Sequence, residues 1–355
     1  MSALFLYCRP GFEAECAAEI QDHAGRNNIF GFCKAKPQSG YALFQPQNTQ
    51  DAILLHQKIH IDDLIFARQW FIVIELHQNL PLEDRIGPLI TSLKNLPSPA
   101  NEVLVETPDT NEGKTLSGLC RSLLPPLKTA LRESDYLKES SDAPRLRIHI
   151  CFLTGATAYI GFEEAARSAP WPMGIPRLKA PASAPSRSTL KLEEAFLRFL
   201  NKEEQTKLLR PGMRAVDLGA SPGGWTWQLV RRHIHVVAVD NGDMDKQLLD
   251  SGLVEHQRED GFRYQPKRIF DWMVCDIVEQ PIRIAKLAAT WMSAGWCHRT
   301  IFNLKLPMKK RYLEVQRCLS LIDSLLSDAG MRYKIRCKQL YHDREEITVY
   351  LERLR

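Results

Sequence analysis

Four aspartates in the second half of the sequence each lie at the end of an apolar run. The runs are AVDLG, HVVAVD, LVEHQRED and DWMVCDIV, and the aspartates are Asp217, Asp240, Asp260 and Asp276. If the runs are strands of an open α/β sheet, their carboxyl ends meet at one crevice, where ligands of that fold bind. A single aspartate in such a place commonly caps the following helix. Four in succession favour a ligand-binding crevice lined by carboxylates.

A glycine-rich turn follows the first of these strands. The turn contains Gly219, Ser221, Pro222, Gly223 and Gly224. It matches neither the G-x-G-x-x-G fingerprint of dinucleotide-binding proteins nor the G-K-[ST] ending of a phosphate loop. A strand-end carboxylate followed by backbone N–H groups instead suits a ligand with an amino group and a nucleoside, such as S-adenosyl-L-methionine. An ordinary strand-to-helix turn that needs glycine for its positive φ is the alternative.

Two lysines and a glutamate are expected near the same crevice. Lys305 lies near the end of the apolar run TIFNLKL, Lys191 lies at the start of a predicted helix, and Glu346 begins the last predicted strand. Core packing gives no reason for a lysine at a strand end, although a surface lysine that extends its amine into solvent is the alternative. In an α/β sheet of this order, Lys191, Lys305 and Glu346 could converge with Asp276 although they are far apart in the sequence.

The elements that must position these residues alternate between strand and helix. Apolar patterns predict strands at 215–219, 235–240, 253–260, 271–278 and 300–306, and helices at 189–200, 224–233, 282–294 and 309–326. Such alternation indicates a mostly parallel sheet with helices on both faces. The last two predicted strands, 333–341 and 346–354, are joined only by HDRE. A crossover helix does not fit into so short a connection, so these strands should pair antiparallel.

The first 165 residues follow a different pattern. We expect a strand at 3–10, a helix at 12–24, and two short strands within 146–163 around a turn at 154–156. A further helix begins near residue 116, and Pro125 and Pro126 are expected to interrupt it. This mixture indicates an α+β module. Residues 166–186 are dense in proline and serine, which predicts a linker or an extended ordered arm between two modules.

The composition is typical of a globular protein, with 44% hydrophobic and 25% charged residues. No apolar run reaches the length of a membrane span, and the first residues lack the basic segment of a signal peptide. We therefore expect a cytoplasmic protein without a membrane partner. The nine cysteines are scattered and never spaced C-x-x-C, so neither a zinc site nor a disulfide framework is predicted.

Charge is distributed unevenly along the chain. Residues 1–165 hold 15 lysines and arginines against 20 aspartates and glutamates, whereas residues 166–355 hold 32 against 22. The basic half is where a polyanion should bind. Within it, strand geometry places Arg332, Lys334, Arg336 and Lys338 on one face. An RNA-binding stripe is one interpretation, and a charged solvent face that protects an edge strand is the other.

Five short motifs resemble those of one enzyme family. The motifs are SRSTLK at 186–191, DLGASPGGW at 217–225, CD at 275–276, NLKLP at 303–307 and REEI at 344–347. They are similar to the K-D-K-E ribose 2′-O-methyltransferases. Among these they resemble most closely the bacterial enzymes that methylate a cytidine ribose of 23S ribosomal RNA, in which a THUMP module precedes a Rossmann-like domain. The similarity covers nearly the whole chain, and it is loosest before residue 165.

The resemblance implies a domain division and partners. It implies a ferredoxin-like part at 1–72, a THUMP-like RNA-binding part at 73–165, the linker at 166–186, and an α/β, Rossmann-like methyltransferase domain dependent on S-adenosyl-L-methionine at 187–355. The implied partner is 23S ribosomal RNA, before or early in large-subunit assembly. The enzyme is expected to be a monomer that requires no metal.

The resemblance also implies roles for individual residues. The catalytic tetrad would be Lys191, Asp276, Lys305 and Glu346, with Lys305 as the general base. Glu346 is preferred to Glu345 because it directly precedes the apolar Ile347. The implied cofactor-binding residues are Ser188, Asp217, Gly219, Ser221, Pro222, Gly223, Gly224, Asp240, Asp260 and Asp276.

Other methyl acceptors leave different marks in a sequence. Methylation of an exocyclic base nitrogen usually accompanies a D/N-P-P-Y motif, whereas this chain has CDIV at 275–278. Methylation of a base carbon needs a cysteine nucleophile, usually after proline or threonine, but Cys275 follows Val274 and Cys297 follows Trp296. A ribose oxygen is therefore the favoured acceptor. A catalytically silent RNA-binding factor on the same scaffold is the competing class, and the complete tetrad argues against it.

Overall fold

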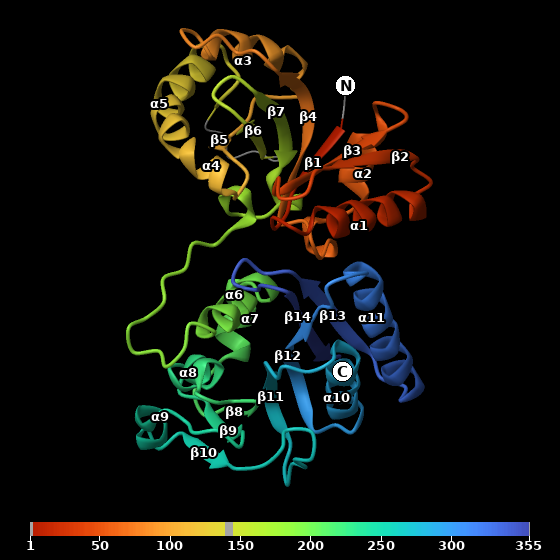
Figure 1. The fold of residues 1–355 in the computed structure, drawn as a ribbon, viewed down its shortest axis with the longest axis vertical. Coiled ribbons are helices and arrows are strands. Elements are labelled where there is room, and N and C mark those ends of the chain that lie inside the picture. Colours follow the sequence, from red (N-terminus) through yellow and green to blue (C-terminus); the bar gives the residue numbers. More distant parts are fainter. Residues whose placement is uncertain (1–2, 139–144, 355) are drawn as a thin grey trace. The chain divides into compact units, whose positions relative to one another are not determined.

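The chain forms two compact units, Met1–Pro176 and Arg177–Arg355, each with its own seven-stranded sheet (Figure 1). The computed structural model describes residues 3–138 and 145–354. The junction between the units falls inside the segment expected to be a linker, 166–186. Across the described residues, no helix has both the length and the apolar character that spanning a membrane requires.

The first unit contains a mainly antiparallel sheet of order β2-β3-β1-β4-β7-β6-β5. Its strands are β1 (Ala3–Tyr7), β2 (Gly31–Ala35), β3 (Tyr41–Pro46), β4 (Gln69–His77), β5 (Glu102–Glu106), β6 (Leu146–Phe152) and β7 (Ala158–Glu164). Its α-helices are α1 (Glu13–Arg26), α2 (Asp51–Lys58), α3 (Ile86–Ser92), α4 (Asn111–Thr115) and α5 (Ser117–Glu133). Among the strands of this unit within the described residues, only β5 and β6 pair in parallel. The antiparallel pair β6–β7 confirms the two strands predicted around the turn at 154–156.

One sheet runs through the whole first unit. The predicted boundary between residues 72 and 73 falls within β4, which pairs with β1 on one side and β7 on the other. The sheet is continuous across this boundary. The division of the unit into a ferredoxin-like and a THUMP-like part remains a prediction.

Helix α5 continues through both of its prolines, so the predicted interruption is wrong. A proline removes the hydrogen bond to the carbonyl four residues earlier, which here affects Arg121 and Ser122. Both of these residues and both prolines are exposed, so water can solvate the freed carbonyls. The opposite side of the helix buries Leu123, Leu127 and Leu131. This apolar packing outweighs the local cost of the prolines.

A buried charged cluster lies within the first sheet around His149 of β6. Its Nδ1 lies 2.8 Å from Glu106 Oε2, and its Nε2 lies 3.1 Å from Glu163 Oε1. The Tyr7 hydroxyl donates to Glu106 at 3.2 Å. Burial alone would lower the pKa of His149, but the two carboxylates outweigh burial and raise it to about 10. His149 is therefore a buried cation at neutral pH, hydrogen-bonded to Glu106 through Nδ1 and within ion-pair distance of Glu163 at Nε2.

The second unit confirms the predicted α/β architecture. Its sheet has the order β10-β9-β8-β11-β12-β14-β13. Its strands are β8 (Arg214–Leu218), β9 (His235–Val239), β10 (Val254–Gln257), β11 (Phe270–Cys275), β12 (Cys297–Lys305), β13 (Tyr333–Lys338) and β14 (Glu346–Arg353). Its α-helices are α6 (Thr189–Phe199), α7 (Lys202–Leu208), α8 (Gly224–Val230), α9 (Lys246–Asp250), α10 (Pro281–Ser293) and α11 (Arg311–Asp328). Helix α7 was not predicted.

Strand directions follow the sequence-based expectation. Strands β10, β9, β8, β11 and β12 run parallel. Strand β14 inserts between β12 and β13 and pairs antiparallel with both, as the short HDRE connection predicted. Helices α6 and α8 lie on one face of the sheet, and α10 and α11 lie on the other (Figure 1).

Apolar packing fixes α6 against the sheet. Leu192 and Phe196 of α6 join Trp225 of α8 and the strand residues Trp272 and Ile301 in one buried cluster. The Phe196 ring packs edge-on against the Trp272 ring, with 5.8 Å between the ring centroids. Burial of this size on a helix of 11 residues sets its rotation about its own axis. The polar residues of α6 that face the sheet edge are thereby held in place.

The basic residues of β13 lie on one face of the strand, but that face packs inward. Lys334 Nζ lies 3.4 Å from Glu204 Oε1 of α7, and the Arg336 guanidinium donates to the Phe199 carbonyl at the end of α6. Lys338 is only 3% exposed. The interpretation of these residues as an open RNA-binding stripe is therefore wrong for Arg336 and Lys338. The Lys334 side chain is 32% exposed and Arg332 is exposed, so for these two it stays a prediction. Lys334 and Arg336 thereby connect β13 to α7 and α6.

Candidate active site

Four charged side chains from distant parts of the chain meet at the carboxyl edge of the second sheet. Lys191 Nζ lies 2.5 Å from Glu346 Oε1 and 3.2 Å from Asp276 Oδ2. Lys305 Nζ lies 2.5 Å from Asp276 Oδ1 and 3.9 Å from Glu346 Oε1. Their side chains are 8% to 19% exposed. The structure thus brings together the four tetrad residues, with two amines interleaved between two carboxylates.

Sheet register positions three members of this tetrad. Lys305 is the last residue of β12, Glu346 is the first residue of β14, and the two are paired across the antiparallel strands. Asp276 directly follows β11, which pairs with β12 on its other side. Lys191 comes from the first turn of α6. Four separate elements therefore contribute one side chain each.

Glu194, one helical turn after Lys191, fixes the loop between β13 and β14. Its carboxylate accepts the N–H of Tyr341 at 2.8 Å and the N–H of His342 at 2.9 Å, and it lies 2.7 Å from His342 Nδ1. Because that loop leads into Glu346, α6 positions two tetrad members at once. The sequence analysis missed Glu194. Its spacing of three from Lys191 on a predicted helix was the available signal.

Neighbouring charges set the protonation of the tetrad. Burial favours the neutral amine of Lys191, but the carboxylates of Asp276 and Glu346 outweigh it and raise the pKa of Lys191. Burial likewise acts to raise the pKa of Asp276, but the Lys305 and Lys191 ammonium groups outweigh it and lower that pKa. At neutral pH the tetrad therefore contains a protonated Lys191 and an ionised Asp276.

Glu345 and Glu346 differ sharply in environment. The Glu345 side chain is 62% exposed and pairs with Arg311 at 2.5 Å, whereas the Glu346 side chain is 8% exposed and contacts Lys191. Alternation along a strand turns adjacent side chains to opposite sides. Of these two glutamates, only Glu346 faces the tetrad.

Asp217 lies one residue before the end of β8 and is 1% exposed. The Thr226 hydroxyl donates to its Oδ2 at 2.6 Å, and no cation among the described residues forms an ion pair with it. Burial raises the pKa of Asp217 to about 7; the Thr226 hydrogen bond opposes this shift, and the charges of Asp276 and Asp240 add to it. A buried carboxyl without a cationic partner fits a ligand that brings its own ammonium group.

The glycine-rich turn is shaped by the protein's own packing. Gly219 and Gly223 have φ values of +78° and +116°, which L side chains rarely adopt. A Cβ on Gly224 would lie 2.2 Å from Ser188 Oγ. The Ser221 hydroxyl donates to the Asp243 carbonyl at 2.8 Å, and Ser221–Pro222 is a cis peptide bond. Ser188 therefore lies against the turn, and the glycines are required even without a ligand.

Asp240 and Asp260 have different settings. Asp240 directly follows β9, and its carboxylate accepts the N–H of Ser221 at 3.1 Å and the N–H of Gly242 at 2.7 Å. Asp260 is exposed and lies three residues beyond β10, where its Oδ1 accepts the N–H of Phe262 at 2.9 Å. Asp240 thus links the glycine-rich turn to the end of β9, whereas Asp260 caps a surface turn after β10.

A buried row of polar side chains lies behind Asp276. The Asn303 amide donates to Asp276 Oδ1 at 2.9 Å, and the Thr348 hydroxyl lies 2.8 Å from Asn303 Oδ1. Asp343 lies beyond them, with its Oδ1 and Oδ2 at 3.2 and 3.0 Å from Thr348 Oγ1. The sequence analysis did not assign roles to these residues. The separation of two between Glu346 and Thr348, which puts both on one face of β14, was the available signal for Thr348.

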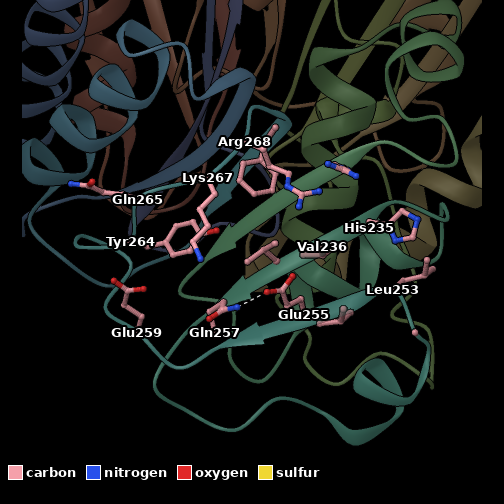
Figure 2. A pocket seen from close by; sticks show the side chains of 15 residues that line it. His235, Val236, Leu253, Glu255, Gln257, Glu259, Tyr264, Gln265, Lys267 and Arg268 are labelled. Atoms are coloured by element: carbon pink, nitrogen blue, oxygen red, sulfur yellow. Dashed lines mark hydrogen bonds between the residues drawn. The ribbon is translucent and has the colours of Figure 1, made fainter.

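A cavity of about 530 Å³ lies elsewhere in the second unit and contains no tetrad residue. Figure 2 shows Glu255 and Gln257 of β10, joined by a hydrogen bond, on one side of it and Tyr264, Lys267 and Arg268 on the loop before β11. Cavity volume alone would direct attention to this region. The convergent charged side chains at the sheet edge instead identify the candidate active site.

Family models match three consecutive segments of the chain. They are the RlmM ferredoxin-like domain at residues 1–71, the N-terminal domain of ribosomal RNA large subunit methyltransferase M at 84–164, and the FtsJ-like methyltransferase at 184–329. Among solved structures, TrmN from Thermus thermophilus aligns over the full length of both chains, but with 16% identity and a TM-score of 0.37 it supports no argument.

Curated relatives match along nearly their whole length. Ribosomal RNA large subunit methyltransferase M of Shewanella woodyi is 50% identical over 99% of this chain and 98% of its own. The protein of the same name from Cellvibrio japonicus is 50% identical over 99% of both chains, and that from Escherichia fergusonii is 49% identical over 100% of this chain and 97% of its own. At this level of identity and coverage, the chain belongs to the ribosomal RNA large subunit methyltransferase M family.

Proposed function

We propose that this member of a ribosomal RNA methyltransferase family transfers a methyl group from S-adenosyl-L-methionine to the ribose 2′-hydroxyl of a cytidine in the peptidyl-transferase region of 23S ribosomal RNA. The observation that carries the proposal is the tetrad of Lys191, Asp276, Lys305 and Glu346. A ribose hydroxyl is a poor nucleophile until it loses its proton, so a positioned base is the main chemical requirement. The tetrad offers two amines at one place for that task.

The two lysines suit different roles. Lys191 contacts both carboxylates closely and is held protonated, which suits it to stabilise negative charge that develops on the ribose oxygen. Lys305 has one close carboxylate, Asp276, and a longer contact to Glu346. We assign Lys305 as the general base: its neutral amine accepts the 2′-hydroxyl proton and becomes an ammonium, while the ribose oxygen takes the methyl group from the sulfonium and leaves a neutral thioether. Asp276 and Glu346 orient the two amines.

The side chains at the ends of β8 and β9 support the proposed cofactor. S-adenosyl-L-methionine supplies an electrophilic methyl group on a sulfonium. The buried, cation-free carboxyl of Asp217 suits its amino group, and Asp240 is the acidic residue placed to bind a ribose. Ser188 and the turn containing Gly219, Ser221, Pro222, Gly223 and Gly224 would line the same crevice, with Asp260 and Asp276 at its ends. Binding there would orient the donor relative to Lys305.

The proposed setting follows from the substrate. The RNA would be 23S ribosomal RNA bound before or early in large-subunit assembly, which occurs in the cytoplasm, by a monomeric enzyme. Its basic residues outside β13, such as Lys309 and Lys310 on the exposed loop after Lys305, are placed to contact phosphates near the tetrad. The reaction as assigned needs no metal.

The test replaces Lys305 by alanine. Cells without the gene should lose one 2′-O-methyl mark of 23S ribosomal RNA, seen as a new site of alkaline cleavage at a cytidine. Wild-type protein and a Lys286→Ala control, which alters an exposed lysine on α10, should restore the mark. Lys305→Ala should not restore it, although it should still bind S-adenosylhomocysteine in a calorimetric titration.

Two outcomes would contradict the assignment. Label from the methyl donor on a base rather than a ribose would exclude the proposed acceptor. Full activity of Lys305→Ala would remove Lys305 as the base. Both naked 23S ribosomal RNA and immature large subunits should be offered as substrates, because RNA-binding modules of this kind can require a shape that forms only during assembly.

A further inference from the structure

In the row of polar side chains behind Asp276, counting hydrogen-bond donors and acceptors locates one proton. Asp276 is an ionised acceptor of two lysines, so the Asn303 group that faces it must be the NH₂, which leaves the Asn303 carbonyl facing Thr348. A carbonyl oxygen only accepts, so the single hydroxyl proton of Thr348 points to Asn303 at 2.8 Å. No other hydrogen bond to Asn303 Oδ1 is formed within the described residues.

The remaining contact assigns a proton to Asp343. Its carboxyl oxygens lie 3.2 and 3.0 Å from Thr348 Oγ1, which has already used its only proton. Two acceptors would repel at this distance, whereas a protonated Asp343 donates to the hydroxyl oxygen. Oδ2, the oxygen at 3.0 Å, accepts the N–H of Leu340 at 2.9 Å, so the proton is assigned to Oδ1, at 3.2 Å from Thr348 Oγ1. A neutral carboxyl satisfies both contacts.

The surroundings of Asp343 agree with this count. Asp343, Thr348 and Asn303 are each at most 1% exposed. Asp343 forms no ion pair within the described residues, and the charged groups that face it are the carboxylates of Glu346 and Glu194 and the more weakly acting amine of Lys191. Burial, followed by the charge of Glu346, raises the pKa of Asp343 well above its ordinary value.

We propose that Asp343, Thr348 and Asn303 form a neutral hydrogen-bond relay that positions Asp276, with Asp343 as its protonated end. The relay fixes Asp276 Oδ1, the oxygen that also contacts Lys305. An ionised Asp343 would compete with Asp276 and Glu346 for Lys191, whereas the protonated form leaves the two tetrad carboxylates matched by two amines. The relay residues touch no reacting atom, so they are positioning residues. Their effect on turnover rests on the proposed function.

Variants of the relay give opposite expectations for similar changes. Asparagine is the isostere of a protonated aspartate, since its carbonyl accepts from Leu340 and its amide donates to Thr348. Asp343→Asn should therefore keep activity within about threefold of wild type. Asp343→Leu and Thr348→Val remove a link and should lower kcat about tenfold, the effect of one lost buried hydrogen bond. KM for RNA and the Kd for S-adenosylhomocysteine should change little.

The matched control is Thr300→Val, which removes a buried hydroxyl from the same sheet. The Thr300 hydroxyl contacts the Met273 sulfur and not the tetrad. It should keep wild-type kcat. The double variant Asp343→Leu/Thr348→Val should be no slower than the slower single variant, because both break one chain. A loss in Asp343→Asn as large as in Asp343→Leu, or a Thr348→Val variant as active as Thr300→Val, would overturn the relay.

Infrared difference spectra test the proton without turnover. Wild type minus Asp343→Asn should show the carbonyl stretch of a protonated carboxyl at neutral pH, and a folded protein without that band would overturn the proposal. If wild type failed to methylate RNA, the proposed function would fall while the infrared result still decided the state of Asp343. If Asp343→Leu failed to fold, Asp343→Asn and Thr348→Val would decide the kinetic part.

Discussion

The buried cation at His149 should make the stability of the first unit depend on pH in an unusual direction. The folded-state pKa of about 10 lies above the ordinary value of 6.5. The charge therefore stabilises the fold fully below pH 6.5, and this stabilisation is lost as pH rises through 10. Each pH unit between these limits removes close to 1.4 kcal/mol, so raising pH from 7 to 9 should cost roughly 2 to 3 kcal/mol.

The measurement is urea unfolding at pH 7 and pH 9, with the unfolded population labelled by a hydrogen–deuterium pulse at a single fixed pH. Peptides from β4, β6 and β7 report on the first unit separately from the second. The His149→Gln variant keeps an amide donor toward Glu106 but cannot titrate. It should be less stable than wild type at pH 7 and should lose much less stability between pH 7 and 9.

A second buried histidine of the same unit provides the control. His56 is 0% exposed and stacks on Trp70, and burial lowers its pKa to about 3. It is neutral at both pH values, so His56→Gln should retain the wild-type pH dependence even if packing is weakened. Equal losses between pH 7 and 9 in wild type and His149→Gln would refute the assignment of a buried imidazolium.

Two further predictions concern the second unit and the junction. Burial raises the pKa of Asp217 to about 7, and a ligand ammonium should bind the ionised form. Affinity for S-adenosylhomocysteine should therefore weaken up to about tenfold per pH unit below 7. Calorimetry at pH 6 to 8 should show this change in wild type and no pH dependence in Asp217→Asn. Trypsin should cut first after Arg177 or Lys179, which are exposed in the segment between the units. Arg187 should be cut later, because its neighbours Ser186 and Ser188 pack against Gly224. A first cut after Arg187 would show that this contact opens readily.

Patterns that depend on burial were predictable from sequence. The alternation of apolar strands and amphipathic helices after residue 189 predicted the parallel sheet, and the short HDRE connection predicted the antiparallel pair β13–β14. The tetrad residues were identified from motif positions at predicted element ends. Their convergence depends on sheet order, and the order that puts β14 beside β12 rather than β13 cannot be obtained from local periodicity.

The wrong or missing predictions share a physical cause, which is tertiary packing. Helix α5 tolerates Pro125 and Pro126 because its other side is buried. The basic residues of β13 alternate as predicted, but sequence does not say which face of a strand is covered, and α6 and α7 cover this one. Glu194 and Thr348 act through contacts with residues far away in the chain, Tyr341 and Asn303, so their spacing from Lys191 and Glu346 was a signal only once those two residues were assigned. Asp343 lies in a loop whose burial local sequence does not indicate.

The insertion of β14 between β12 and β13 has a consequence for the order of refolding. Asp217 and Asp240 lie at the ends of the paired strands β8 and β9 beside the glycine-rich turn, whose contacts are close in sequence and can form early. Glu346 and Thr348 reach their partners only when β14 pairs with β12. Helix α11 and strand β13 separate these two strands in the sequence. Until then β12 presents an open apolar edge, the kind of segment through which partly folded chains associate. The glycine-rich turn between β8 and α8 thus belongs to the first stages of assembly of this sheet, and the tetrad belongs to its completion.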